Sequence, residues 1–117
     1  MGTFFHPITL IGPSGETESL DALVDTRADF TTVPAGVTRR LGVQPHRTIK
    51  LRIASGEFVE WELGRVEAEL DGTREQILCV FGAAEAPPVI GAHTLEAFLL
   101  GVDPSGGRLV PREAFLM

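Results

Sequence analysis

Turn-forming residues recur about every ten positions along this chain, and they separate short apolar segments that are typical of β-strands. Gly12-Pro13-Ser14-Gly15 is one such turn, and Asp71-Gly72 is a strong signal for a two-residue hairpin. About seven or eight strands fit between the turns, with two short helices predicted at 34–41 and 94–100. This spacing predicts a mostly β domain, closed into a barrel or built as a sandwich. The 117 residues suffice for one domain, over residues 1–117, and not for two.

Two of the predicted elements carry specific expectations. The apolar residues of the long strand 58–70 change parity at Gly64-Arg65, which predicts a bulge or bend at that point. In the predicted helix 94–100, Thr94 is expected to cap the N-terminus. Three residues of this helix are expected on its buried face: Leu95, Phe98 and Leu99.

Composition excludes several classes of function. The net charge is −6 and the densest basic spot is Arg39-Arg40, which argues against a nucleic-acid partner and an acidic membrane surface. No apolar run approaches the ~18 residues that a membrane span needs. The start of the chain lacks the pattern of a signal peptide, so a cytoplasmic location is expected. The single cysteine, Cys79, is expected in the core, and no paired histidine spacing indicates a metal site or another cofactor.

The segment around Asp25 is the strongest candidate for chemistry. Leu23 and Val24 deliver this carboxylate from an apolar run into the polar stretch Thr26-Arg27-Ala28-Asp29. A carboxylate at the end of a buried strand is paired, neutralised or used, because an unpaired buried charge is costly. These residues alone leave open that Asp25 and Asp29 simply cap a turn. Thr31 and Thr32, which follow, are interpreted as ordinary strand residues.

Several motifs in order resemble the retroviral-type, or retropepsin-like, aspartic proteases. Leu23-Val24-Asp25-Thr26-Arg27-Ala28 is similar to their active-site loop, in which an apolar pair precedes Asp-Thr-Gly-Ala. Val89-Ile90-Gly91-Ala92-His93-Thr94 resembles the apolar-apolar-Gly segment that leads into their last helix. The segment 52–61, with Ser55-Gly56 at its tip, lies where the family has a flap. Val102-Asp103-Pro104 and the residues after it resemble the ending of the bacterial members.

The resemblance implies a fold and a chemistry. The fold would be a closed β-barrel protomer with one or two short helices, forming a two-fold dimer. Peptide hydrolysis by this route uses two carboxylates that share one proton, so that one accepts a proton from water and the other donates one. Since the chain offers one matching aspartate, the pair would come from two copies, and the apolar residues of 112–117 would be buried between them. The substrate would be a peptide or protein, with no metal or cofactor.

The resemblance also assigns roles residue by residue. Asp25 would be catalytic. Four residues would support the active site: Thr26, Arg27, Ala28 and Gly91. Four residues would contact the substrate: Asp29, Ala54, Ser55 and Gly56.

Arg27 departs from the family, which has glycine at this position. A cation beside Asp25 favours the ionised carboxylate, and a doubly ionised pair has no proton to donate. Arg27 could instead point away and pair with Asp29 or Asp21. Two other functions stay open: a dimeric binding or scaffolding domain that keeps the fold without catalysis because of Arg27, and a monomeric β-barrel that binds a ligand.

Overall fold

The computed structural model describes residues 3–103 and 105–113. These residues form nine strands and two short helices, so the predicted mostly β fold is confirmed. In chain order the elements are β1 (Phe4–Ile11), β2 (Thr17–Val24), β3 (Thr31–Pro34), α1 (Ala35–Arg40), β4 (Pro45–Arg52), β5 (Phe58–Leu70), β6 (Thr73–Gly82), β7 (Val89–Ile90), α2 (Ala92–Ala97), β8 (Leu100–Asp103) and β9 (Arg108–Pro111).

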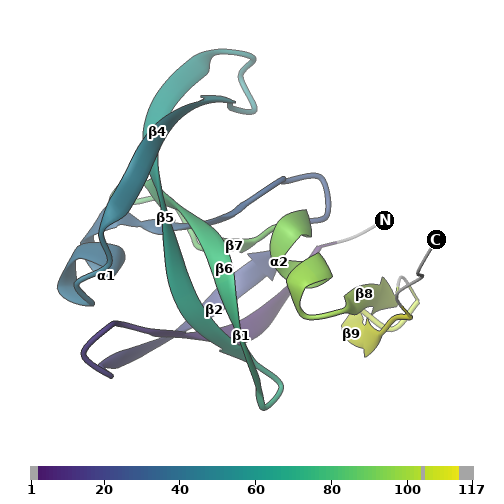
Figure 1. Cartoon of the computed structure of the whole chain (residues 1–117). Helices are drawn as coiled ribbons and strands as arrows, with labels where there is room; N and C mark the ends of the chain where they lie inside the picture. Colours follow the sequence, from purple (N-terminus) through teal and green to yellow (C-terminus); the bar gives the residue numbers. More distant parts are fainter. Residues whose placement is uncertain (1–2, 104, 114–117) are drawn as a thin grey trace.

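Six of the strands close into a ring. The main sheet has the order β1-β2-β7-β3-β6-β5-β4, and β1 pairs a second time, with β5, through Thr9–Ile11. This second pairing closes the ring and leaves β4 outside it. In Figure 1, β4 and the first half of β5 rise from the ring as a long curved hairpin, which we call the flap (residues 45–63). β8 and β9 form a separate hairpin.

The core fills the interior of the ring. Strand residues that alternate with half-buried ones supply it, as in Ile8 and Leu10 of β1 and Ala68 and Leu70 of β5. The turn between β5 and β6 is Asp71-Gly72, and both residues have the positive φ that the two-residue hairpin turn requires. The strongest turn signal in the sequence is thus confirmed.

The irregularity predicted at Gly64-Arg65 lies on the neighbouring strand instead. β5 pairs with β6 without interruption, whereas β4 shifts its register against β5 between Pro45 and Arg47. The parity of apolar residues in β5 changes because opposite faces of the strand are covered in its two halves. One face is covered in the half that belongs to the flap, and the other face is covered in the half that belongs to the ring. Gly64 lies at this crossover, where an added Cβ would come 2.9 Å from the carbonyl oxygen of Gln44.

Two expectations for the second helix are wrong. α2 begins at Ala92, with Gly91 at the cap position, so Thr94 lies inside the helix and is buried. Leu95 and Phe98 face the core as expected, but Leu99 is 48% exposed and has a φ of 55°. Leu99 ends the helix in the left-handed conformation, which turns its side chain away from the core.

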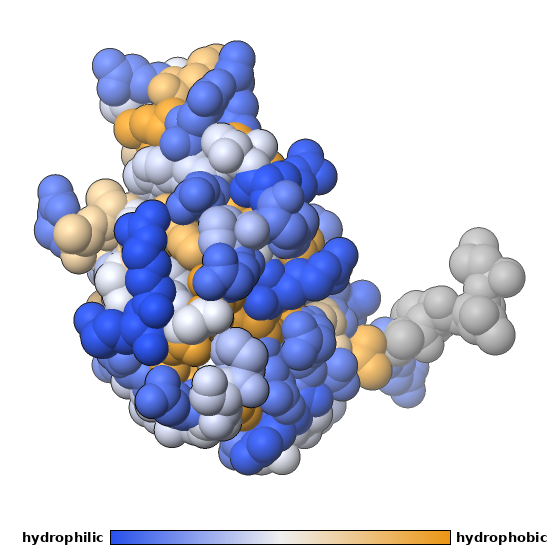
Figure 2. All heavy atoms as spheres, turned by 60° about the vertical axis from the view of Figure 1, so that its left-hand side comes forward, coloured by the Kyte–Doolittle hydropathy of each residue, from blue (hydrophilic) through white to orange (hydrophobic). Residues whose placement is uncertain are grey.

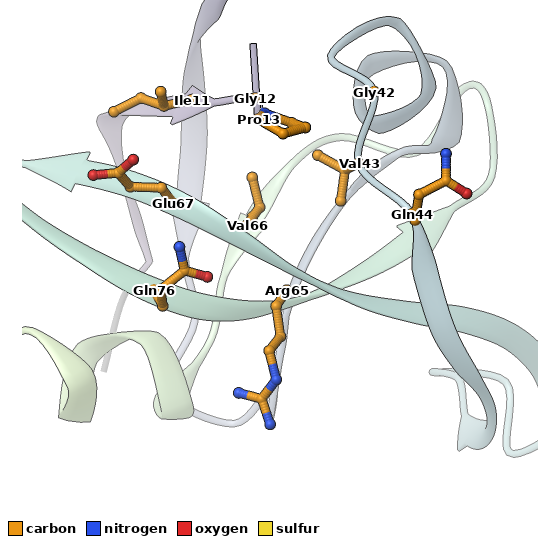
Figure 3. Close-up of a pocket in the computed structure, with 10 residues that line it drawn as sticks. All are labelled: Ile11, Gly12, Pro13, Gly42, Val43, Gln44, Arg65, Val66, Glu67 and Gln76. Carbon is orange, nitrogen blue, oxygen red and sulfur yellow. The ribbon is translucent and has the colours of Figure 1, made fainter. Parts of the chain in front are cut away.

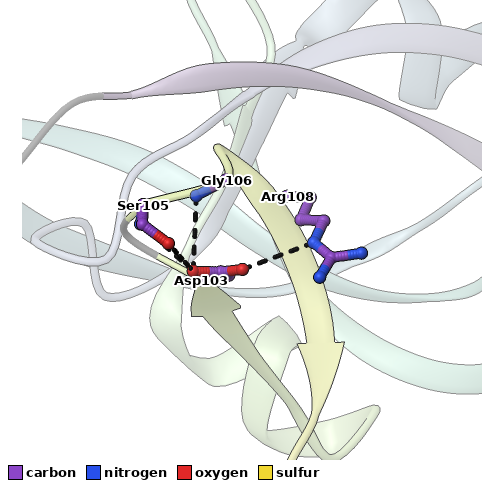
Figure 4. Close-up of polar contacts among 4 residues, drawn as sticks. All are labelled: Asp103, Ser105, Gly106 and Arg108. Carbon is purple, nitrogen blue, oxygen red and sulfur yellow. Dashed lines mark hydrogen bonds and ion pairs between the residues drawn. The ribbon is translucent and has the colours of Figure 1, made fainter.

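The carboxylate of Asp103 binds several groups in the turn of the β8–β9 hairpin (Figure 4). Asp103 Oδ1 accepts hydrogen bonds from the Ser105 hydroxyl and from the backbone amides of Ser105 and Gly106, and Arg108 Nε donates to Oδ2. These bonds, the Ser105 hydroxyl first, lower the pKa of Asp103. The segment that resembles the bacterial ending includes Pro104, which lies outside the described residues. Residues 114–117, which the sequence predicts to be buried between two copies, also lie outside them.

Candidate active site

The loop that carries Asp25 joins two strands that have a strand from later in the chain between them. It connects β2 to β3, and β7 lies between these two strands, parallel to β2 and antiparallel to β3. The amide of Asp25 donates to the carbonyl of Ile90 over 3.0 Å, and the amide of Ala28 donates to the carbonyl of Asp25 over 3.1 Å. Because its two ends are tied to β7, the loop is held at a defined width.

Gly91 packs against the far side of the same loop. The amides of Ala92 and His93 donate to the carbonyls of Ala28 and Asp29, over 2.7 and 2.9 Å. A Cβ at position 91 would lie 2.4 Å from the carbonyl oxygen of Phe30, which is backbone and cannot swing aside. The structure therefore brings Gly91 and Ala28 into direct contact next to Asp25.

Thr31 is a further residue of this site that the motif does not reveal. Its buried hydroxyl accepts a hydrogen bond from the amide of Gly91 over 3.2 Å and bonds the hydroxyl of Thr94 in α2. Thr31 is a strand residue as predicted, but it also couples β3 to β7 and α2. The available signal was alternation: Thr31 has the parity of Val33, so a polar side chain stands at a buried position.

Asp25 and Arg27 are in direct contact. Asp25 Oδ1 accepts a 3.0 Å bond from the backbone amide of Arg27 and a 3.3 Å bond from Arg27 Nε. The side chain of Asp25 is 23% exposed and that of Arg27 is 85% exposed. The guanidinium thus reaches back to Asp25, and the alternative that pairs it with Asp29 or Asp21 is not what the structure shows.

This contact sets the proton affinity of the carboxylate. The pKa of Asp25 is lowered from its ordinary value, chiefly by the hydrogen bond from the backbone amide of Arg27. Partial burial acts in the opposite direction, and the guanidinium adds to the lowering through its hydrogen bond and its charge. The largest contribution therefore comes from a backbone group that glycine at position 27 would also supply.

A groove of about 500 Å³ lies between this loop and the flap. Residues 27–30 and Thr32 line it from the loop side, and Arg47, residues 49–53 and Trp61 line it from the flap side. Of the residues predicted to contact substrate, Asp29 lines the groove and is exposed. Three do not line it in the single chain, because they form the exposed tip of the flap: Ala54, Ser55 and Gly56.

Thr26, the remaining predicted site residue, does not line this groove. Thr26 is exposed at the bend of the loop, next to Asp25. His93 stacks on Phe30, which lines the groove, with ring centroids 5.1 Å apart. The β4 residues Ile49 and Leu51 enter the site although no motif marks them, and only their alternation with charged residues could have indicated a half-covered strand.

Other parts of the molecule offer little chemistry. A second hollow of about 380 Å³ lies between the β1–β2 turn, the connection from α1 to β4 and the middle of β5, and it shares no residue with the groove (Figure 3). Burial raises the pKa of Cys79 to about 12, which confirms a core thiol. Within residues 3–103 and 105–113, no group of three or more His, Cys, Asp or Glu residues could hold a metal ion. No helix in the same residues is long and apolar enough to cross a membrane.

Solved structures identify the fold. No protein-family model matches the sequence, and no curated protein does. The EIAV protease in complex with the inhibitor HBY-793 superposes with a TM-score of 0.59 at 17% identity, covering 83% of this chain and 88% of that chain. The solution structure of the simian foamy virus (mac) protease superposes with a TM-score of 0.57 at 12% identity, covering 80% and 92%. At such identities the likeness shows the fold alone, and the fold is retropepsin-like.

Proposed function

We propose that this chain is one protomer of a homodimeric aspartic protease that hydrolyses peptide bonds with Asp25 from each copy. The observation that carries the proposal is the setting of Asp25. This carboxylate leaves a core strand in a loop fixed by β7 and α2, beside a groove covered by a flap, in a retropepsin-like fold. A peptide or protein in the cytoplasm would be the substrate, with no metal, nucleic acid or membrane involved.

The chemistry requires two copies. Two carboxylates close to each other cannot both ionise comfortably, so one keeps a proton and serves as acid while the other serves as base. One Asp25 accepts a proton from water, and the other donates a proton to the carbonyl oxygen of the peptide. In this arrangement Thr26, Ala28 and Gly91 hold the loop, while Asp29 and the flap tip, residues 54–56, contact the peptide backbone.

Arg27 favours a second candidate, a dimeric binding or scaffolding domain without catalysis. Its guanidinium lies on Asp25 Oδ1 and lowers the pKa of that carboxyl, although it contributes less than the backbone amide does. A pair of carboxylates held ionised in this way has no acid. The two candidates therefore differ in whether the guanidinium leaves Asp25 when the dimer and substrate assemble.

Cleavage of an unstructured protein separates the two candidates. We expect Arg27→Gly to raise cleavage with a maximum at mildly acidic pH, since the variant loses the guanidinium and keeps the backbone hydrogen bond. We expect Asp25→Asn to abolish activity in both backgrounds, because an amide cannot accept the proton of water. If Arg27→Gly is no more active than the parent and Asp25→Asn changes nothing, the protease proposal fails and the scaffold is the better account.

Sedimentation tests the assembly independently of catalysis. The protease and the scaffold both predict a species of twice the chain mass at micromolar concentration. A monomer at every concentration would exclude both and leave the ligand-binding barrel.

A further inference from the structure

Cations gather around the groove, although the molecule as a whole is acidic. The chain carries 10 Lys and Arg against 16 Asp and Glu, for a net charge of −6. The residues that line the groove nevertheless include four cations, and Asp29 is the one carboxylate among them. The four cations are Arg27, Arg47, Lys50 and Arg52. Whether a cation can pair with an acidic ligand depends on what it already contacts.

Three of these cations already contact another side chain of the molecule. Arg27 Nε lies on Asp25. Lys50 and Arg52 alternate along β4 with the half-buried Ile49 and Leu51, so their side chains belong to the opposite face of the strand. On that face they lie over the ring of Phe58, 5.5 and 4.5 Å from its centroid.

Arg47 is the cation that remains. It shares the strand face of Ile49 and Leu51, the face that lines the groove, and it is exposed. Among the residues that the structure describes, no carboxylate forms an ion pair with it and no side-chain hydrogen bond holds it. The register shift of β4 falls immediately before Arg47, where the flap leaves the ring. In Figure 2 the flap stands above the body of the molecule, with apolar atoms set among hydrophilic ones.

We propose that Arg47 makes the groove selective for extended peptides with an acidic side chain two residues from an apolar one. Arg47 and Ile49 are two residues apart on one strand face, and an extended peptide also presents every second side chain to one side. The carboxylate of the acidic side chain accepts charge-assisted hydrogen bonds from the guanidinium. Aspartate and glutamate can both form this pair in a bidentate geometry. The apolar side chain packs on Ile49 and Leu51. This selectivity rests on the proposed function insofar as the groove is where a peptide lies.

Binding of two matched peptides tests the selectivity. The peptides are fluorescent and extended, and they differ at one position, glutamate or glutamine, two residues from a leucine. We expect the parent chain to bind the glutamate peptide about tenfold more tightly in an anisotropy titration at neutral pH and low salt. We expect Arg47→Gln to bind both peptides equally, and Arg47→Glu to prefer a lysine peptide of the same sequence.

Lys50→Gln is the matched control, because it removes the same charge from the opposite face of β4. It should keep the preference for glutamate. If Lys50→Gln and Arg47→Gln lose the preference for glutamate equally, the effect is that of the overall positive charge and the inference is overturned. Equal binding of both peptides by the parent chain, or no binding of either, would also overturn it. Circular dichroism of each variant verifies that it is folded.

The same titration distinguishes this inference from the proposed function. Mass spectrometry of the peptides afterwards reports cleavage. Selective binding without cleavage at any pH would retain Arg47 as a specificity residue and reject the protease. Cleavage with no preference for glutamate would retain the protease and reject Arg47 as a specificity residue.

Discussion

At the scale of single residues, the active-site loop depends on one buried hydroxyl. Thr31 accepts from the amide of Gly91 and bonds Thr94, so it links three elements inside the core. We expect Thr31→Val to lower the free energy of unfolding by about 1–3 kcal/mol, because the mutation leaves two buried polar groups without a partner. Thr32→Val, one residue along the same strand, should change it by less than about 0.5 kcal/mol. Urea unfolding of the two variants decides, and equal effects would contradict the role of Thr31.

Gly91 is constrained by space. A Cβ at this position would meet two backbone atoms of Phe30, at 2.4 and 2.5 Å. We expect Gly91→Ala to destabilise the protein by about 1–3 kcal/mol, since the loop must move to make room. Gly101→Ala is the matched control, because the nearest atom to a Cβ there is 3.9 Å away. Thermal unfolding should show a loss for the first variant alone, and a crystal structure of Gly91→Ala should show the loop displaced.

At the scale of elements, the flap should be loosest at its tip. Gly56 has a φ of 92° and no atom within 4 Å of a Cβ built on it, and a long hydrogen bond of 3.4 Å from Arg52 Nη1 reaches its carbonyl. The strand arms on either side are paired from Arg52–Phe58 inward. We expect the amide of Ser55, at the tip, to exchange with deuterium faster than the amides of Ile53 and Gly56, which donate hydrogen bonds to backbone carbonyls. Protection of the tip in the free protein equal to that of the arms would show a flap closed without substrate.

Elements could be predicted from the sequence wherever local chemistry decides them. The turn at Asp71-Gly72 and the bounds of β5 follow from hairpin residues and alternation, and the observed strand is Phe58–Leu70 as predicted. Leu99 and the register shift in β4 could not be predicted, because long-range packing decides which face of a segment is covered. In the site, Asp25 and Gly91 follow from motif resemblance, whereas the contribution of β4 depends on how the flap folds over the loop.

At the scale of the whole molecule, two carboxylates make the fold sensitive to acid. Asp25 and Asp103 both have a pKa below the ordinary value of 3.8. A carboxyl whose pKa is lower in the folded than in the unfolded chain stabilises the fold above its unfolded pKa, and this contribution is lost as pH falls through the folded value. We expect the free energy of unfolding to decline as pH drops below about 4. Urea unfolding across this range should show a shallower decline for Asp25→Asn, and a decline identical to that of the parent would contradict the assignment for Asp25.

The position of β7 has a consequence for how the molecule comes into being. β7 lies between β2 and β3 in the sheet, although β4, β5 and β6 come before it along the chain. Until Val89 and Ile90 arrive, the amide of Asp25 lacks its acceptor and the strand that separates β2 from β3 is missing. Synthesis delivers the chain from its N-terminus, so β4, β5 and β6 are made before the loop can take its shape. The flap is therefore complete before the loop beneath it can perform any chemistry.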